Sequence, residues 1–355
     1  MICFFCSLPY HVITCLNMAL STFKSEKKCL VLFNGFNGYE AVINVCKDSN
    51  IFEEVILVKT DFDINWKQNW NRRYHYFFLY KSLSWLCKKF IFDKIVFFII
   101  DPLNVSHIIK KVLNKNPKCE VCIAEDGIGS YLSNKLYLPS EKQLFWLSLL
   151  EQKKYYEKIS YLYLLYPEFL AYKPAQTVRK ISKKGFETPE FQKFITQMFE
   201  CRKIPKCDYL LLQQPLAQEK EDLKIISDSQ ERLFQILDSK VKGKRSYIKL
   251  HPRTKSFIRL DNCIKLEQNS PFETMIDENI NSSTIVTVFS TAAFTPYMLF
   301  SFTPRIILLY RLCDNFIFAD DMNKFLKVFV KKYKEEHAEI YIPETIEEFE
   351  KLLEV

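Results

Sequence analysis

Glycine is scarce in this sequence, with only six residues in 355. Average usage of about 7% would give roughly 25. Four of the six follow two predicted strands, as Gly35 and Gly38 and as Gly127 and Gly129. Because glycine is used where the backbone turns tightly or approaches a ligand closely, these two turns are candidate binding positions. The predicted second domain, residues 207–355, has only Gly243, which precedes a strand, and this counts against a glycine-rich loop for a diphosphate.

Long hydrophobic runs are also missing. No stretch reaches 18 consecutive apolar residues, so the sequence predicts no transmembrane helix. The N-terminal run from Met1 to Cys6 lacks the basic region of a signal peptide and is soon followed by Pro9. This run is therefore expected to be the first strand of the fold.

Charge of one sign is not concentrated anywhere. The net charge of +8 comes from 50 basic and 42 acidic residues, and the basic residues are scattered in pairs. Nucleic-acid binders usually gather basic charge on one face or arm, so we expect no nucleic-acid partner. The excess fits attraction to phosphate-bearing substrates or to an anionic membrane. Together with the aromatic and basic stretch from Lys153 to Lys184, it suggests peripheral attachment at the inner face of the cell membrane.

Twelve cysteines include two C-x-x-C pairs, Cys3 with Cys6 and Cys119 with Cys122. Such pairs can bind zinc. Both pairs fall in predicted strands, where residues i and i+3 point to opposite faces, so we interpret them as core residues. Free core thiols fit the reducing cytoplasm, which is the expected compartment.

Short apolar runs alternate with helical segments along the first 130 residues. This pattern is typical of a parallel sheet covered on both faces, and hence of a Rossmann-like domain. The predicted strands are 2–6, 29–33, 52–58, 94–100 and 119–123, and the helices between them are about 9–23, 39–48, 74–90 and 105–113.

A second alternating series begins at residue 207. Its predicted strands are 209–212, 246–250, 285–289 and 305–309. The expected domains are residues 1–172, which include an aromatic helical extension at 141–172, and residues 207–355, joined by a polar linker at 173–206. The extension is interpreted as a lid or a dimer contact, which leaves a homodimer open. The predicted fold class is α/β and GT-B-like, with two Rossmann-like doubly wound domains facing each other across a cleft. Fold alone does not choose a function.

An acidic pair follows the fifth predicted strand, as Glu125-Asp126-Gly127. In an open parallel sheet, ligands bind at the carboxyl ends of the strands. The pair could be an ordinary strand-end turn, or it could supply a general base. The turn residues expected near such a site are Asn34, Gly35, Gly127 and Gly129.

Polar groups also follow the strands of the second domain. They are His251-Pro252, Pro271-Phe272-Glu273 and Ser290-Thr291. Basic side chains surround the first of them, namely Lys249, Arg253 and Lys255. A helix start that carries hydroxyl groups can bind an anion, so these groups together predict a phosphate site.

In this order the motifs resemble those of the bacterial sialyltransferases of glycosyltransferase family 52, which act on lipooligosaccharide and capsule. Bacterial polysialyltransferases and family 80 sialyltransferases are more distant relatives. The resemblance rests on Glu125-Asp126-Gly127, His251-Pro252 and Ser290-Thr291, and on Phe272-Glu273 and Gln214-Pro215-Leu216, and it spans most of the chain.

The resemblance implies an inverting transfer of sialic acid from CMP-sialic acid to a galactoside hydroxyl on a bacterial surface glycan. Glu125 would be the general base, with Asp126 supporting it or binding the acceptor, although the choice of base between the two stays open. His251 would stabilise the departing phosphate. The donor-binding residues that it implies are Gln214, Pro252, Glu273, Ser290 and Thr291.

The alternatives are a GT-B enzyme that uses another nucleotide sugar, and a non-catalytic partner in polysaccharide assembly. The partners of the enzyme would be a nucleotide-sugar donor and a glycan acceptor, with no cofactor and no metal ion. Asp61-Phe62-Asp63 matches a metal-binding D-x-D motif, but it lies in a polar loop and is interpreted as solvated surface.

Overall fold

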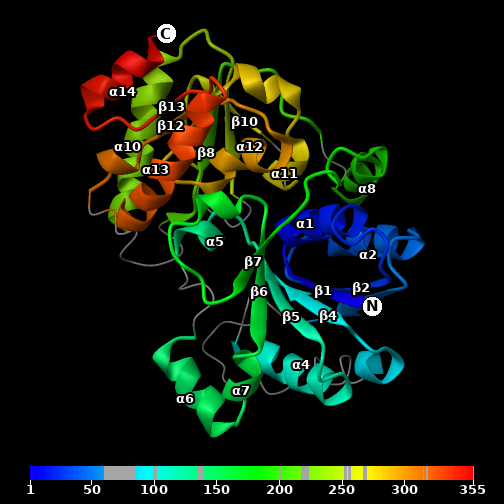
Figure 1. Cartoon of the computed structure of the whole chain (residues 1–355). Coiled ribbons are helices and arrows are strands. Elements are labelled where there is room, and N and C mark those ends of the chain that lie inside the picture. Colours follow the sequence, from blue (N-terminus) through cyan, green and yellow to red (C-terminus); the bar gives the residue numbers. More distant parts are fainter. Residues whose placement is uncertain are drawn as a thin grey trace. The chain divides into compact units, whose positions relative to one another are not determined.

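A computed structural model describes residues 1–59, 85–98, 102–133, 139–199, 202–216, 224–251, 254, 257–266, 270–314, 316 and 319–354. The Asp61-Phe62-Asp63 motif and most of the predicted helix 74–90 lie outside these ranges. The chain divides into two compact units, Met1–Glu200 and Cys201–Val355. Figure 1 shows the course of the chain.

Unit 1 is built on one parallel sheet of seven strands, in the order β3-β2-β1-β4-β5-β6-β7. The strands are β1 (Ile2–Cys6), β2 (Lys28–Phe33), β3 (Glu54–Val58), β4 (Lys94–Phe97), β5 (Glu120–Ala124), β6 (Ile159–Leu164) and β7 (Thr177–Lys180). Every residue of β1 is buried, as expected for a strand that helices cover on both faces. The apolar runs of the sequence therefore became the central strands.

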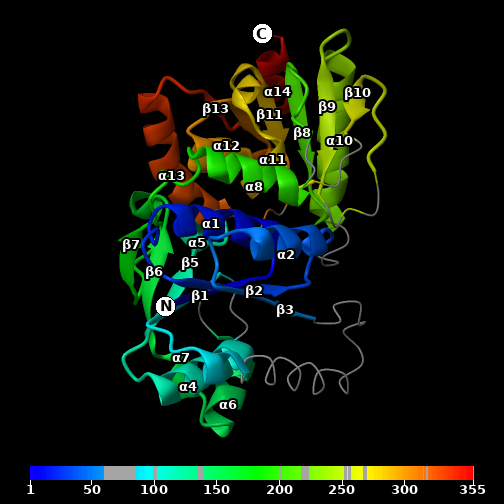
Figure 2. The same ribbon diagram turned by 90° about the vertical axis from the view of Figure 1, so that its right-hand side faces the viewer.

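Helices cover both faces of this sheet. They are α1 (Pro9–Leu20), α2 (Tyr39–Asp48), α4 (Pro102–Lys115), α5 (Gly129–Leu132), α6 (Glu141–Leu149), α7 (Lys153–Tyr156) and α8 (Pro189–Phe199). Figures 1 and 2 show α1 and α2 on one face of the sheet and α4, α6 and α7 on the other. Helix α8 packs against α1 and α2.

Two stretches differ from the sequence prediction. The aromatic extension 141–172 is not helical throughout, because Ile159–Leu164 forms β6 and pairs with β5. The stretch 173–206, expected to be a linker, contributes β7 and α8 to unit 1. Strand β7 pairs with β6 at the edge of the sheet.

Unit 2 is a second parallel sheet, in the order β10-β9-β8-β11-β12-β13. Its strands are β8 (Tyr209–Gln213), β9 (Ser246–Leu250), β10 (Cys263–Lys265), β11 (Thr284–Thr287), β12 (Arg305–Leu308) and β13 (Ile340–Tyr341). Its helices are α10 (Lys224–Lys240), α11 (Phe272–Met275), α12 (Thr295–Phe300), α13 (Ala319–Glu335) and α14 (Ile346–Leu353), with 3₁₀ turns η4 (Glu278–Ser282), η5 (Thr291–Phe294) and η6 (Tyr310–Leu312).

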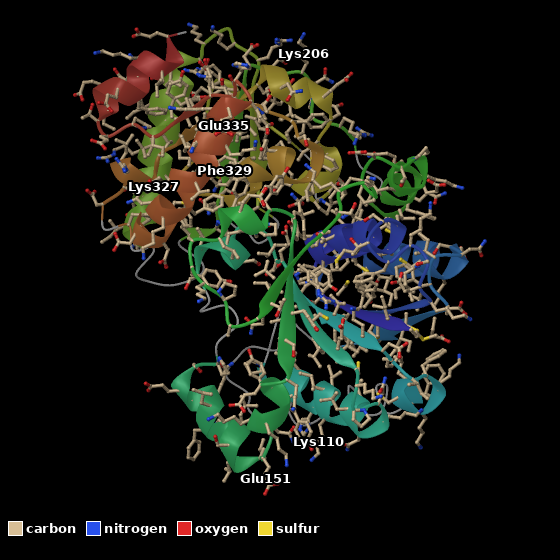
Figure 3. All side chains as sticks on the ribbon, in the orientation of Figure 1. Lys110, Glu151, Lys206, Lys327, Phe329 and Glu335 are labelled. Carbon is tan, nitrogen blue, oxygen red and sulfur yellow. The ribbon has the colours of Figure 1, made fainter. Side chains whose placement is uncertain are left out.

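An aromatic cluster joins α12 to α13 in unit 2. Phe329 lies at its centre, with ring centroids 4.9 Å from Phe294 and 5.6 Å from Tyr297 (Figure 3). Both contacts are edge-on, the arrangement that aromatic rings prefer. This cluster fixes η5 and α12, which are the next elements after β11.

The strand order reverses direction once in each sheet. In unit 1 the chain builds outward from β1 through β2 to β3 and then returns to add β4 beside β1. In unit 2 it builds from β8 through β9 to β10 and returns to add β11 beside β8. Ligands of open α/β sheets bind outside the carboxyl ends of the strands at such reversal points. The ends of β1, β4, β8 and β11 are therefore where a site is expected.

The cysteines of the described residues are all free, and all but Cys87 are buried. Burial raises the pKa of Cys119 and Cys122 to about 12, so both thiols stay protonated at neutral pH. In the part of the chain that the structure describes, no helix is long and apolar enough to cross a membrane.

Candidate active site

The acidic pair lies at the carboxyl end of β5, as the sequence predicts. Pairing with β6 continues one residue past the strand, since the Glu125 N–H donates to the Tyr163 carbonyl at 3.0 Å. The chain then turns at Gly127, whose φ of +71° suits glycine. The Asp126 N–H donates to Ser130 Oγ at 2.8 Å, which ties the turn to α5. Strand and turn together fix both carboxylates.

Glu125 is fully buried, and three donors hold its carboxylate. Tyr10 Oη donates to Oε1 at 2.6 Å, and the Leu165 N–H donates to Oε2 at 2.7 Å. The Tyr131 hydroxyl also donates to Oε2. Burial raises the pKa of Glu125, although the three hydrogen bonds oppose that rise. Both oxygens are therefore occupied within the protein.

Asp126 is in a different position, with 26% of its side chain exposed. Its Oδ1 lies 2.7 Å from Nε2 of His11, whose own side chain is fully buried. Among the described residues, no partner is found for its second oxygen, Oδ2. Asp126 is thus the carboxylate of the pair that a substrate hydroxyl could reach.

The hydrogen bonds of His11 define its protonation state. The Ser7 N–H donates to Nδ1 at 3.1 Å, so Nδ1 must carry a lone pair. The proton of a neutral imidazole is then on Nε2, which donates it to Asp126 Oδ1. The ring also stacks on Phe98, with centroids 5.0 Å apart and planes 12° from parallel. His11 is therefore a neutral, rigidly held donor to Asp126.

His11, Tyr10 and Tyr131 are not among the site residues predicted from the sequence. The stretch after β1 was interpreted only as the start of a helix, in which His11 is the third residue. No local signal in the sequence identifies it, because its place in the site depends on the strand order, in which β1 and β4 end side by side at the reversal. His11 follows β1 and Phe98 follows β4, and the two rings stack at that edge.

Asn34 and Gly35 lie at the end of β2, away from the acidic pair. Two strands, β1 and β4, stand between β2 and β5. At the usual spacing between strands, the ends of β2 and β5 are about 14 Å apart. The structure therefore brings Gly127 and Gly129 to the acidic pair but leaves Asn34 and Gly35 at a distance.

In unit 2, Gln214 joins the ends of β8 and β11 at the reversal point. Its side-chain oxygen accepts from the Phe289 N–H at 3.1 Å. Gln230 of α10 holds the backbone of Gln214, accepting from its N–H at 2.9 Å and donating to its carbonyl at 3.1 Å. Next to it, the His251 N–H donates to the Gln213 carbonyl at 3.2 Å. Gln214 and His251 therefore share one edge of the sheet.

Ser290 and Thr291 stand at the start of η5. Ser290 is the N-cap, since its Oγ accepts from the Ala292 N–H at 3.3 Å. The Ser290 N–H in turn donates to Thr287 Oγ1 of β11 at 3.3 Å. The structure thus places both hydroxyl groups at the reversal point, with that of Ser290 engaged in capping.

Glu273 of α11 and Lys249 of β9 lie close enough for the charge of each to shift the pKa of the other. Lys249 is only 5% exposed, and its Nζ donates to the Leu250 carbonyl at 3.2 Å. Burial lowers the pKa of Lys249, while the charge of Glu273 raises it. Burial likewise raises the pKa of Glu273, and Lys249 lowers it. The pair places a cation among the predicted phosphate contacts. Pro252, Arg253 and Lys255 lie outside the described residues.

Comparison with known proteins identifies the fold and the family. The structure is similar to that of the α/β-galactoside α-2,3-sialyltransferase of Photobacterium phosphoreum, at 12% identity over 96% of this chain and 97% of that chain, with a TM-score of 0.55. A second match is the GT-B domain of a Photobacterium damselae sialyltransferase, at 12% identity over 97% and 100% of the two chains, with a TM-score of 0.48. The two doubly wound parallel sheets are those of the GT-B fold, as the sequence predicts.

The sequence comparisons point in the same direction. No curated protein sequence matches this chain. The family model of the α-2,8-polysialyltransferases (POLYST) matches residues 2–309, which include every proposed site residue. The sequence motifs indicate this family as a relative of family 52, and membership of family 52 itself stays a prediction. The chain belongs to the α-2,8-polysialyltransferase family.

Proposed function

We propose that this protein is an inverting sialyltransferase that moves sialic acid from CMP-sialic acid to a hydroxyl group of a bacterial surface glycan, of capsule or lipooligosaccharide. The observation that carries the proposal is the Asp126 carboxylate, partly exposed at the end of β5 and held by a neutral histidine. Such a group can accept the proton of an acceptor hydroxyl. Family membership supports the choice of sialic acid as the transferred sugar.

The general base is Asp126 rather than Glu125, the residue favoured from the sequence. Both oxygens of Glu125 accept hydrogen bonds inside the protein, whereas the Asp126 side chain is partly exposed and its contact with His11 uses only Oδ1. Glu125 then acts as a positioning residue, because it fixes Tyr10 and the β6 backbone around the turn. His11 positions the Asp126 carboxylate by holding its other oxygen.

The reaction follows from these roles. Asp126 takes the proton of the acceptor hydroxyl while that oxygen attacks the anomeric carbon of sialic acid from the face opposite CMP. The bond from the anomeric carbon to the phosphate oxygen breaks, and CMP leaves with the electron pair. His251, with Ser290, Thr291 and the nearby Lys249, would stabilise the charge on the phosphate. Glu273 would bind the ribose hydroxyls, and Gln214 holds the strand ends in place. The transfer needs no metal ion or cofactor.

The acceptor is a galactoside or a glycan that ends in sialic acid. The galactoside is the acceptor implied by the sequence resemblance. The family match favours the second, since its members are described as α-2,8-polysialyltransferases. Both acceptors would present a hydroxyl group to the same base. One assay that offers each acceptor in turn distinguishes the two.

The test is transfer from CMP-sialic acid to a fluorescent lactoside and to its sialylated form, with the products separated by chromatography. We expect Asp126→Asn to lower kcat by about 10²–10⁴-fold, the usual contribution of a general base. Glu125→Gln, nearly isosteric, should retain most of the activity. If a folded Glu125→Gln variant is inactive while Asp126→Asn is active, the base is Glu125.

The donor is tested separately by thermal unfolding with CMP, UDP, GDP and TDP. A ligand that binds only the folded state stabilises it by about 2.7 kcal/mol at 100 times its Kd. We expect a rise in Tm with CMP alone. A rise with UDP or GDP would indicate another nucleotide sugar on this fold. No rise and no transfer would indicate a non-catalytic partner in polysaccharide assembly.

A further inference from the structure

Helix α6 exposes an unusual amount of apolar surface. Only Leu147 of its large apolar residues is buried. The exposed ones, with their exposed fractions, are Leu144 at 37%, Phe145 at 62%, Trp146 at 43%, Leu149 at 61% and, directly after the helix, Leu150 at 47%. We call these five residues the α6 apolar surface. Contiguous exposed apolar surface of this kind marks a site of interaction.

The apolar side chains surround the helix instead of forming one stripe. At about 100° per residue, the positions from Leu144 to Leu150 spread over roughly 240° of the helix circumference. A helix that packs against a single protein face needs an apolar stripe of about 100°. An apolar surface this wide suits a medium that contacts the helix on several sides, as the acyl region of a bilayer does.

The surroundings of α6 are basic. Helix α4 packs against both α6 and α7, and Figures 1 and 2 show the three helices together at one end of unit 1. The lysines in 102–115 and 141–158 are Lys110, Lys111, Lys115, Lys142, Lys153, Lys154 and Lys158, and the acidic residues are Glu141, Glu151 and Glu157. The ratio of basic to acidic residues in these two ranges, seven to three, is well above that of the whole chain, which has 50 basic and 42 acidic residues.

The lysines are interleaved with aromatic rings near the apolar surface. Nζ of Lys110 lies 5.7 Å from the ring centroid of Tyr155, and Nζ of Lys154 lies 5.4 Å from it. Figure 3 shows Lys110 at this end of the unit, with Glu151 beyond it. Aromatic rings and long basic side chains are typical of the membrane interface, where apolar stems lie below charged head groups.

We propose that the α6 apolar surface, with Lys110 of α4 and Lys154 of α7, forms a docking surface for a bilayer that contains anionic phospholipid. Lys115 is not counted among these contacts, because its ammonium group donates to backbone carbonyl oxygens. The apolar side chains would enter the boundary between head groups and acyl chains, and the lysine ammonium groups would contact the lipid phosphates. This places membrane attachment on a short helix of unit 1. The inference does not depend on the proposed sialyl transfer.

The experiment is flotation of the full chain with phosphatidylcholine vesicles, with and without about a third phosphatidylglycerol, at low and high salt. We expect binding to the anionic vesicles and at least tenfold weaker binding to the neutral ones. Because the Debye length shrinks from about 10 Å at 0.1 M salt to about 3 Å at 1 M, high salt should weaken the binding.

The matched variants are Phe145→Ser with Leu149→Ser on α6, and Ile264→Ser on β10 as the control. Ile264 and Leu149 have the same exposure, 61%. We expect the α6 double variant to lose at least tenfold in vesicle binding, with an unchanged melting curve, and the control to bind like the wild type. Equal binding by all three proteins, or no binding by the wild type at low salt, would overturn the proposal.

A second copy of the chain is the competing occupant. Sedimentation of the wild type without lipid distinguishes the two occupants. If the surface binds a membrane, the wild type should be a monomer, and the α6 double variant should have the same mass. A dimer that the α6 variant dissociates would refute the membrane proposal and identify the surface as a contact between copies.

Discussion

Replacing Gly185 by alanine should destabilise unit 1. Gly185 lies far from the acidic pair in the sequence. A Cβ atom at this position would lie 2.6 Å from Asn17 Oδ1 and 2.9 Å from Asn17 Cα, and it would also collide with the Asn17 carbonyl oxygen. Real Cβ atoms do not approach so closely, so the segment or α1 must move.

The cost follows from the role of Asn17. This side chain is fully buried, donates from Nδ2 to the Ser182 carbonyl at 2.8 Å and accepts from the Phe186 N–H at 3.1 Å. Overpacking costs about 1–3 kcal/mol, and each buried polar group left without its partner adds about 1–3 kcal/mol. A total of about 4 kcal/mol would lower the Tm by roughly 8–16 °C for a unit of this size.

The assay is scanning calorimetry, because two units can melt separately. Gly243→Ala is the control. Its φ is +82° and no atom lies within 4 Å of the added Cβ, so only backbone strain of about 1–2 kcal/mol is expected. If Gly185→Ala melts within about 2 °C of the wild type, the described packing of residues 182–186 on α1 is wrong.

Three further predictions concern the site and its support. Burial raises the folded pKa of Glu125 above the unfolded value of 4.5, so the wild type should lose stability as pH rises from 4.5 toward the folded pKa. Glu125→Gln should remove this pH-dependent loss of stability. The glutamine amide can turn its Nε2 toward Tyr10 and keep its Oε1 as the acceptor for the Leu165 N–H and the Tyr131 hydroxyl. Calorimetry of both proteins over a pH series tests this. His11→Ala should lower kcat about tenfold to a hundredfold with little change in KM, and His11→Gln, which can still donate, should restore part of it. If His11→Gln is no better than His11→Ala, a positioning hydrogen bond is not the role of this residue. Arg179→Met should cost at most about 1 kcal/mol in urea unfolding, because the pair with Glu120 is partly exposed and Glu120 keeps its second partner, Lys94, and an unchanged urea midpoint would show that the pair contributes nothing.

The central strands were predictable because they are buried on both faces. β1, β2 and β5 appear in the sequence as short apolar runs between helices, and the predicted 119–123 differs from β5 by one residue. The order of the strands was not predictable, since nothing local states which strands are neighbours. The same holds for β7, whose Thr177–Lys180 sequence is partly exposed and has no apolar run.

Strand β6 shows why an apolar run alone does not distinguish a strand from a helix. Ile159–Leu164 continues the aromatic composition of α6 and α7, so the whole stretch was interpreted as helical. Its tyrosines and isoleucine favour a strand once β5 provides a partner. Pairing with β5 in the folded protein therefore made this segment a strand.

The acidic pair was found from the sequence because both residues are adjacent in it. The different roles of the two carboxylates could not be predicted, because these roles depend on residues from a distant part of the chain that the strand order brings to the pair. Tyr10 and His11 are 115 positions away from Glu125 and Asp126. They reach the pair only because β1 lies beside β4, and β4 beside β5.

The buried thiols make the opening of each unit measurable without an engineered cysteine. The thiolate is the species that alkylating reagents attack, and burial suppresses it in the folded state, as at Cys122 of unit 1 and Cys313 of unit 2, whose pKa values are raised to about 12. Labelling at these positions therefore requires local or global unfolding. Mass spectrometry of peptides that contain Cys122 and Cys313 would report the opening rates of the two units separately in one sample. A nucleotide that binds only unit 2 should slow labelling at Cys313 and leave Cys122 unchanged.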